Sequence, residues 1–322
     1  AVFPTGSIIQ YKNVLVTGGA GIAGHSTIKK LLDLGANVRA TIYKSKGLDI
    51  PAHKNLEVVR CDLHSYEKCL EITKDIDIVF NLVAYIRGAK SQTDSPIDLV
   101  RNNIVPAVNM MDASVKNKVD RFGFIGSSTM YPDVSYPVKE SEAFESEPHP
   151  CYTGVGWMKR YSEKVIEHFN DISKTKFAIV RTTAMYGPHD SFNERGHAIP
   201  QLILKADRQM NPFNVWGDGS HVRDFVFVED VIDALLLVTE KRPIAKAYNV
   251  ASGTPTTVKE LVETITGVYG YEPEFQFDLT KPIMIPKRLV DVSLIKDDLG
   301  WQAPHTLQAG LEKTIDWYRN NK

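Results

Sequence analysis

Three glycines near the start of the chain are spaced so that a loop built from them could bind a phosphate group. Gly18, Gly21 and Gly24 form a G-x-x-G-x-x-G pattern directly after the short apolar run 14–16. A strand entering this loop and a helix leaving it would leave backbone N–H groups unpaired at the helix N-terminus, where the partial positive charge favours a pyrophosphate. Glycines allow the tight turn and the close approach of the backbone to the phosphate. Apolar residues at helical spacing follow, and this context favours a dinucleotide cofactor over an ordinary glycine-rich turn.

The second expected strand, Val38 to Ile42, ends without the acidic residue that usually selects NAD. An NAD site places Asp or Glu there to accept hydrogen bonds from the ribose 2′-hydroxyl, whereas the 2′-phosphate of NADP needs cations nearby. Positions 42–46 hold no acid, and Arg39, Lys44 and Lys46 are close in the sequence. We therefore predict NADP, with NAD as the alternative if these lysines belong to a solvated loop.

Apolar strands and helical stretches alternate along the first half of the chain. Strands are expected at 14–16, 38–42, 56–60, 76–83 and 122–125, and helices at 104–114 and 157–170. Such alternation predicts an α/β fold, a Rossmann-like doubly wound parallel sheet with ligands at the carboxyl ends of its strands. After Val180 the pattern loosens into segments that contain Pro and Gly, which indicates a smaller C-terminal substrate domain. The expected division is 11–185 and 223–252 for the NAD(P)-binding domain, and 186–222 and 253–322 for the substrate domain.

Composition limits the partners and the compartment. The chain has 322 residues, 43% of them apolar, which suffices for one large or two interleaved domains with a substantial core. Its 38 basic and 39 acidic residues give a net charge of −1, so no field favours nucleic acid or an anionic membrane. No apolar run approaches the roughly 20 residues of a spanning helix, and no signal peptide is evident, although residues 1–10 look like an untidy leader. The three cysteines are sparse, odd in number and without metal-ligand spacing, so we expect a cytoplasmic protein without a metal site.

A set of motifs is spread along the chain from residue 12 to residue 318. They are the glycine loop, 62–63, 81–84, Asn103, 126–132, Lys159, 186–192, 197–200, 215–217 and 223–226. In this order and spacing they resemble the motifs of the extended short-chain dehydrogenase/reductases, the family of NDP-sugar epimerases, dehydratases and reductases. Within that family the chain is most similar to the GDP-fucose synthases, which are GDP-4-keto-6-deoxymannose epimerase/reductases.

The resemblance implies roles for particular residues. Ser127 would hydrogen-bond the reacting sugar oxygen, and Lys159 would hold the nicotinamide ribose and lower the pKa of a neighbouring phenol. His197 matches a histidine that acts as general acid, although a lone histidine is more often structural. The positions that would bind the substrate nucleotide are Lys205, Trp216, Arg223 and Asp291. The alternative is that these are ordinary surface or core residues. The positions that would bind the cofactor are Gly18, Gly21, Ile22, Gly24, Lys44, Asp62, Leu63, Leu82, Ala84, Asn103, Lys159 and Thr182.

Two positions depart from the family pattern, and both concern proton transfer. The family's Tyr-x-x-x-Lys places a phenol four residues before the lysine, and Val155 stands there. Valine has no ionisable group, so it cannot pass a proton as hydride moves. The thiol that GDP-fucose synthases use as epimerisation base, two residues beyond the active serine, is replaced by Thr129. Its hydroxyl is a far poorer base than a thiol of pKa about 8.5. The Asp-Glu pair of the dehydratases is absent too, since Met130 follows Thr129.

Tyr152 is a candidate to replace the missing phenol. It lies three residues before Val155, on roughly the same face if the helix already runs there. The glycines on either side of Val155 would let the backbone adjust and bring the phenol toward Lys159. The alternatives are that Tyr152 only packs at the helix start, or that the valine is an engineered replacement. Ser127 with an ordered water and His197 are the other candidate proton donors.

Two of the expected helices have wide apolar stripes. In 157–170, apolar or aromatic residues occupy more of the helix than one core-facing side needs, and 104–114 is similar. In the resembling family the corresponding helices pair with their symmetry mates in a four-helix dimer interface. We therefore predict a homodimer, and the alternative is that these helices only cover the sheet.

These observations leave two hypotheses of different class. The first is an NAD(P)-dependent sugar-nucleotide epimerase or reductase that acts on a GDP- or other NDP-sugar with hydride transfer at C4. The second is a catalytically silent module that binds a dinucleotide or a sugar nucleotide. Loss of the phenol at Val155 favours the second, whereas retention of Ser127, Lys159 and the nucleotide-binding positions favours the first.

Overall fold

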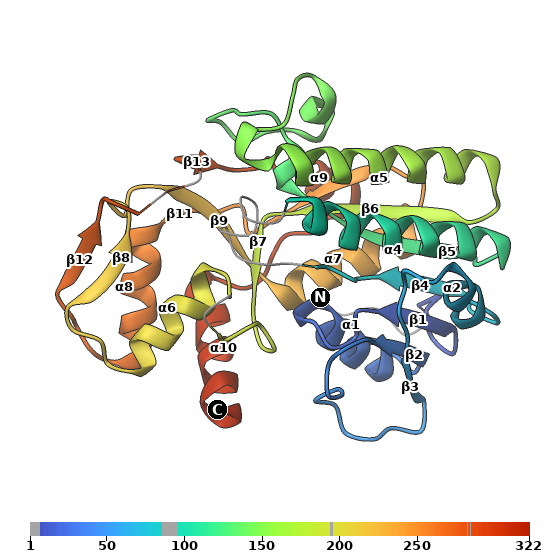
Figure 1. Ribbon diagram of the computed structural model, residues 1–322, viewed down its shortest axis with the longest axis horizontal. Helices are drawn as coiled ribbons and strands as arrows, with labels where there is room; N and C mark the ends of the chain where they lie inside the picture. The colour runs from blue at the N-terminus through green and yellow to red at the C-terminus, as the bar shows by residue number, and fades with distance from the viewer. Residues whose placement is uncertain (1–6, 86–95, 194–195, 282, 284) are drawn as a thin grey trace.

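A parallel sheet forms the centre of the larger part of the molecule (Figure 1). The computed structural model describes residues 7–85, 96–193, 196–281, 283 and 285–322. Within them, seven parallel strands follow the order β10-β6-β5-β4-β1-β2-β3. Their bounds are β1 Asn13–Thr17, β2 Asn37–Ile42, β3 Leu56–Arg60, β4 Ile78–Asn81, β5 Arg121–Ser127, β6 Lys176–Thr182 and β10 Ala247–Val250. The strand order reverses between β1 and β4, as in a doubly wound sheet, so the predicted fold class is confirmed.

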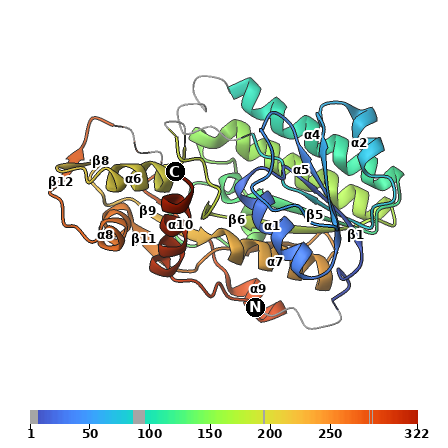
Figure 2. The ribbon, with the colours of Figure 1, turned by 90° about the horizontal axis from the view of Figure 1, so that it is seen from below.

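Helices cover both faces of this sheet. On one face α1 (Ile22–Asp33) packs against α7 (Val228–Lys241), and their side chains share a core with Val14 and Val16 of β1. On the other face α4 (Pro96–Lys116) lies between α2 (Tyr66–Ile72) and α5 (Thr153–Ile172), over a second core that contains Leu15. Alternate residues of β1 therefore enter different cores, as a strand buried on both faces requires. Figure 2 shows the two helix layers on opposite sides of the sheet.

The limits of several elements differ from the sequence prediction. The α4 and α5 helices are both longer than expected, while β4 is shorter. The sequence prediction missed the start of α5 because the first turn of this helix contains Gly154 and Gly156, which are poor helix formers. Close packing requires glycine at position 156, because a Cβ there would lie 2.6 Å from Pro148 Cβ and 2.9 Å from the Thr129 carbonyl oxygen. The glycine thus lets the N-terminus of α5 rest directly on the segment that follows β5.

The C-terminal part forms a smaller lobe around a third core. Helices α6 (Ala198–Asp207), α8 (Val258–Tyr269) and α10 (Leu307–Asn321) supply most of its buried side chains. Strand β8 (Phe213–Trp216) pairs with β12 (Phe275–Asp278), and β9 (Val222–Phe227) pairs with β7 (Ala184–Tyr186), β11 (Pro255–Thr257) and β13 (Lys287–Arg288). The short helix α9 (Ser293–Leu299) packs back onto the first core through Ile295. Strand β9 thus belongs to the smaller sheet, although most of it falls in the segment 223–252 that was expected for the NAD(P)-binding domain. The division of the chain into two domains stays a prediction.

A buried ion pair joins α5 to the sheet. Arg181 of β6 and Glu163 of α5 are 4% and 1% exposed, and Arg181 Nη2 lies 2.6 Å from Glu163 Oε2. A second bond runs from Arg181 Nε to Glu163 Oε1 at 2.9 Å. Arg181 Nη1 also donates to the Tyr131 hydroxyl and to the Glu140 carbonyl oxygen, each at 3.0 Å. Burial lowers the pKa of Arg181, but the bonds to Glu163 outweigh it and raise that pKa, so Arg181 stays charged.

We expect Arg181→Met to lower the free energy of unfolding by about 3 to 5 kcal/mol, because it leaves Glu163 buried without a cation. Equilibrium unfolding in urea, followed by circular dichroism, measures the change. Lys164→Ala is the matched control, since it removes an exposed pair with Glu167 on the same helix and should change stability by less than about 1 kcal/mol. An Arg181→Met protein as stable as the wild type would show that the pair does not hold α5.

Candidate active site

The glycine-rich loop joins β1 to α1 at the switch point of the sheet. Gly18 has a positive φ of 67°, and a Cβ there would lie 2.8 Å from the Leu82 carbonyl oxygen. A Cβ at Gly24 would collide with the Gly18 carbonyl group. Gly21 caps α1 without a side-chain hydrogen bond, which leaves the first N–H groups of the helix to an external anion. The close backbone approach and the open helix terminus fit the pyrophosphate of a dinucleotide.

The other expected cofactor residues follow neighbouring strand ends. Ile22 opens α1, Asp62 and Leu63 follow β3, Leu82 and Ala84 follow β4, and Thr182 ends β6. The Thr182 hydroxyl is buried and has no hydrogen-bond partner among the described residues, which fits a contact with a ligand. Asn103 has a structural task instead: its amide donates to the carbonyl oxygens of Leu99 at 2.6 Å and Tyr85 at 3.0 Å and accepts from the Tyr85 N–H. Asn103 therefore shapes the segment after β4.

The cations near the end of β2 differ from those that the sequence indicates. Arg39 lies within β2 and donates to Glu57 of β3 at 2.9 Å, so it is occupied in a structural ion pair. Lys44 is exposed in the loop after β2. Arg60, the last residue of β3, donates to two backbone carbonyl groups of the same loop. Sequence reasoning missed Arg60 because only the parallel register of β2 and β3, which pairs Ile42 with Arg60, brings it there.

Ser127 and Thr129 form a hydroxyl pair at the carboxyl end of β5. Thr129 belongs to the 3-10 turn η1 (Ser128–Met130), and Ser127 caps this turn by accepting the Thr129 N–H at 3.2 Å. The Thr129 hydroxyl donates to Ser127 Oγ at 2.9 Å. The Ser127 proton is then left for a substrate oxygen, since a hydroxyl has one donor. Thr129 thus orients Ser127.

Lys159 lies on α5 beside the same end of β5. Its Nζ donates to the Ile125 carbonyl oxygen at 3.2 Å, two residues before Ser127. The side chain keeps some exposure, yet burial around the amine lowers the pKa of Lys159 to about 8, while Glu163 opposes that shift. Glu163 is bound to Arg181, and among the described residues no carboxylate forms an ion pair with Lys159. The amine is therefore placed near the hydroxyl pair without a counter-ion.

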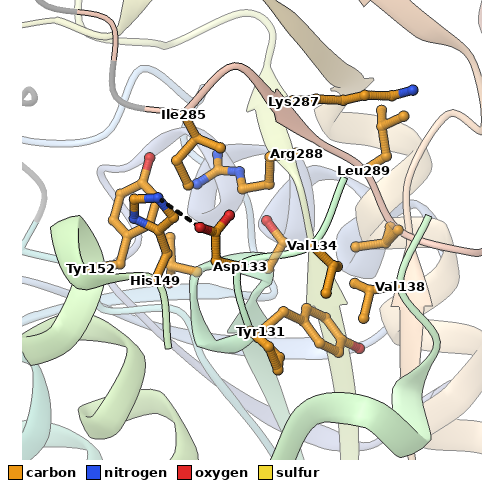
Figure 3. Close-up of a pocket in the computed structure, with 14 residues that line it drawn as sticks. Tyr131, Asp133, Val134, Val138, His149, Tyr152, Ile285, Lys287, Arg288 and Leu289 are labelled. Atoms are coloured by element: carbon orange, nitrogen blue, oxygen red, sulfur yellow. Dashed lines mark ion pairs between the residues drawn. The ribbon is translucent and has the colours of Figure 1, made fainter. Parts of the chain in front are cut away.

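Tyr152 lies outside α5, in contrast to the sequence argument that puts it on the face of Lys159. It ends the 3-10 turn η3 (Pro150–Tyr152) with φ −117° and ψ 16°, and α5 begins one residue later. The Arg288 guanidinium carbon lies 5.1 Å from the centre of the Tyr152 ring, and the His149 ring meets it edge-on at 6.3 Å (Figure 3). The Tyr152 ring therefore packs against the guanidinium group of Arg288.

Arg288 and Arg223 lie side by side on neighbouring strands. They are paired in the register of β13 and β9. Burial, and then the charge of Arg288, lower the pKa of Arg223 to about 10, whereas Tyr152 and Cys151 raise it. Within the described part of the chain, neither arginine forms an ion pair with a carboxylate. Two adjacent guanidinium groups without a counter-ion can bind a dianionic group such as a diphosphate. Only Arg223 was accessible to sequence reasoning, because the register between these strands cannot be read from the chain.

A small cavity lies beside Thr129 and Arg288. Its volume is about 20 Å³, enough for about one water, and Thr129, Tyr152 and Arg288 are among its lining residues (Figure 3). His149 also lines it, with Nε2 3.6 Å from Asp133 Oδ2 and with Nδ1 accepting the Cys151 N–H. The cavity joins the turn that follows β5 to β13, and so brings Thr129 and Arg288 into one site.

The expected nucleotide-binding residues differ in their surroundings. Trp216 ends β8 with 52% of its surface exposed, so its ring is available for stacking. Lys205 donates to the Asn214 carbonyl oxygen at 2.7 Å, and burial lowers its pKa. Asp291 accepts the Ser293 N–H at 2.8 Å just before α9, which is a turn-forming contact. That these three residues bind the substrate nucleotide stays a prediction.

His197 is exposed and immediately precedes α6. Burial raises the pKa of Asp190, and the charge of His197 opposes this effect, so the two side chains lie within electrostatic reach of each other. The role of general acid for His197 stays a prediction. Among the described residues, no group of three or more His, Cys, Asp and Glu side chains is arranged to hold a metal ion.

Comparison with known proteins agrees with this arrangement. Residues 14–251 match the NAD dependent epimerase/dehydratase family. The chain belongs to this family. It is 29% identical to GDP-L-fucose synthase of Escherichia coli K12 over 326 residues, which covers 97% of this chain and 98% of that protein.

Solved structures of epimerases share the whole fold of this family member. A UDP-N-acetylglucosamine 4-epimerase of Methanobrevibacter ruminantium M1, in complex with UDP-N-acetylmuramic acid, is 26% identical with a TM-score of 0.87 and covers 97% of this chain and 100% of its own. UDP-glucose 4-epimerase of Thermotoga maritima, with UDP-glucose, is also 26% identical, with a TM-score of 0.83 and coverage of 96% and 99%. The predicted class, an enzyme of the epimerase/dehydratase family with a nicotinamide dinucleotide cofactor, is confirmed.

Proposed function

We propose that this protein is an NADP-dependent sugar-nucleotide epimerase or reductase that transfers hydride at C4 of a GDP- or other NDP-sugar. The observation behind the proposal is the pair Arg223 and Arg288, whose guanidinium groups form no ion pair with a carboxylate among the described residues. Arg288 also lines the small cavity next to Thr129. The glycine loop already supplies a phosphate site through backbone N–H groups. A module that bound only a dinucleotide would have no use for a second, cationic site.

The chain's own residues then take the following tasks. Ser127 donates a hydrogen bond to the reacting sugar oxygen, and Thr129 fixes the orientation of Ser127. Lys159 holds the ribose of the nicotinamide, which supplies or accepts hydride when it is bound. Arg223 and Arg288 bind the diphosphate, Tyr152 contacts the sugar-phosphate end beside them, and Trp216 stacks on the base.

The cofactor preference rests on the surroundings of the end of β2. Positions 42–46 hold no acid for a ribose 2′-hydroxyl, whereas Arg60 and Lys44 supply positive charge. The Ser45 hydroxyl is buried in the same loop without a partner among the described residues. A guanidinium group, a hydroxyl and an ammonium group suit the 2′-phosphate of NADP.

We further propose a homodimer formed through α4 and α5. Large apolar side chains remain exposed on and beside these helices, with Ile97 79%, Tyr161 55% and Trp157 44% exposed. Single exposed apolar residues need no explanation, but a group on two adjacent helices favours an interface. Sedimentation equilibrium determines the oligomeric state directly.

A cytoplasmic location is proposed from the thiols. Cys61, Cys69 and Cys151 are unpaired, as expected in a reducing compartment. Burial raises the pKa of the Cys69 thiol to about 12, so it is inert. Among the described residues, no helix has the length and apolar character that crossing a bilayer requires.

We expect NADP(H) to bind at least about tenfold more tightly than NAD(H), because contacts to the 2′-phosphate are charge-assisted. Titration followed by protein fluorescence measures both affinities. Arg60→Ala should bring the ratio toward one, whereas Arg39→Ala, on the neighbouring strand and paired with Glu57, should leave the ratio unchanged. Tighter binding of NAD(H), or NAD bound to the purified protein, would contradict the cofactor assignment.

We expect UDP-glucose, GDP-mannose or GDP-4-keto-6-deoxymannose to raise the melting temperature of the NADP-bound protein, and at least one of them to be converted. Arg288→Gln should weaken binding of that sugar nucleotide on the order of 10- to 100-fold without changing NADP affinity. Lys287→Gln is the matched control, because the Lys287 amine points away from Arg288 in Figure 3. Stabilisation by NADP alone, with no effect of any sugar nucleotide, would favour a silent binding module.

A further inference from the structure

The proposed reaction needs a group that exchanges a proton with the sugar oxygen while hydride moves at the attached carbon. Val155 occupies the position of the family's phenol and has no exchangeable proton. Tyr152 lies in η3 with its ring against Arg288, and the exposed His197 lies near Asp190 in the other lobe. Neither forms a hydrogen bond with Lys159 or Ser127 among the described residues. This inference rests on the proposed function and concerns the identity of that group.

Lys159 is one helical turn after Val155, on the same face of α5. Among the described residues its amine has one hydrogen-bond acceptor, the Ile125 carbonyl oxygen at 3.2 Å, and it lies 5.2 Å from the centre of the Phe124 ring. An ammonium group has three donors, so donors remain for a ligand. With valine at position 155, the residue one turn before Lys159 supplies no phenol beside this amine.

The charges around Lys159 leave its proton exchangeable. Glu163, one turn later on α5, would neutralise an isolated lysine, but both of its oxygens bind Arg181 of β6. The elements packed against this part of α5 are α4, β5, β6, η1 and η3, and Glu163 is the only described charge that shifts the Lys159 pKa. Burial is the larger effect and lowers that pKa to about 8. Near neutral pH the amine can therefore both give and take a proton.

We propose that the Lys159 amine is itself the acid/base group of this enzyme, in the place that a tyrosine phenol takes in its relatives. In the reductive direction, a bound reduced nicotinamide would supply hydride to the carbonyl carbon of the sugar. The Lys159 ammonium group gives one proton to the carbonyl oxygen, which becomes a hydroxyl, and the lysine is left as a neutral amine that regains a proton from water. Oxidation runs through the same steps in reverse, and Ser127 holds the oxygen in both directions.

If Lys159 is the acid/base group, the rates of reduction and of oxidation must depend on pH in opposite ways. The lysine is protonated below its pKa, so the rate of reduction should be constant below about pH 8 and fall tenfold per pH unit above it. The rate of oxidation should rise with pH and level off above about pH 8. A phenol of ordinary pKa about 10 would shift both transitions upward.

The test uses Lys159→Arg in the full-length protein. Arginine keeps the positive charge and the donors that hold a ribose, but it does not release its proton. We expect NADP affinity within about threefold of the wild type and turnover reduced on the order of 100-fold or more. Lys164→Arg on the exposed side of α5 is the matched control, and it should change neither the NADP affinity nor the turnover. Tyr152→Phe, which removes the alternative phenol, should keep the decline of the reductive rate above about pH 8.

A second measurement does not depend on turnover. In protein labelled with ¹³C at the lysine ε-carbons, the signal that Lys159→Arg removes should titrate near pH 8 in the wild type. Titration at the ordinary lysine value of about 10.4 would overturn the proposal, as would a Lys159→Arg enzyme with turnover within about threefold of the wild type. A wild type that converts none of the sugar nucleotides, although Lys159 titrates near pH 8, would overturn the proposed function and the proton step with it.

Discussion

The buried ion pair between Arg181 and Glu163 is the interaction on which the site depends. It joins the middle of α5 to β6, the strand next to β5, and so fixes the helix that carries Lys159 against the strand that ends in Ser127. The same pair removes Glu163 from the lysine one turn earlier. Burial is the larger influence on the pKa of Lys159 and lowers it, while Glu163 opposes that shift. The ion pair thereby positions the helix that carries Lys159 and engages the one described carboxylate that influences the pKa of this lysine.

Two different means of binding anions meet at this site. The glycine loop offers backbone N–H groups at the start of α1, and its selectivity comes from close approach that only glycine permits. Across the carboxyl edge of the sheet, Arg223 and Arg288 offer side-chain charge from the smaller lobe. The first suits the pyrophosphate of a dinucleotide and the second suits the diphosphate of a sugar nucleotide. The hydroxyl pair at the end of β5 lies between the two lobes, where a sugar would meet a nicotinamide.

The sequence indicated the parts of this arrangement that depend on local pattern. The glycine spacing, the alternation of strands and helices, and the motifs around Ser127 and Lys159 are contiguous, so they predicted the sheet and the cofactor edge. Contacts between distant segments were not accessible in the same way. Arg60 reaches the end of β2 only through the register of β3, and Arg288 meets Arg223 only through the register of β13 with β9. Tyr152 would share the face of Lys159 only if the helix ran through it, and the sequence could not decide this; in the structure a 3-10 turn ends at Tyr152.

We propose above all that a dinucleotide and a nucleoside diphosphate occupy opposite ends of one site, with Ser127 and Lys159 between them. A crystal structure of the protein with NADPH and guanosine diphosphate tests this arrangement most directly. We expect the diphosphate of the guanosine nucleotide on Arg223 and Arg288, the NADPH pyrophosphate on the glycine loop, and the nicotinamide ribose at Lys159. A guanosine diphosphate bound elsewhere, with Arg223 and Arg288 left to solvent, would contradict it.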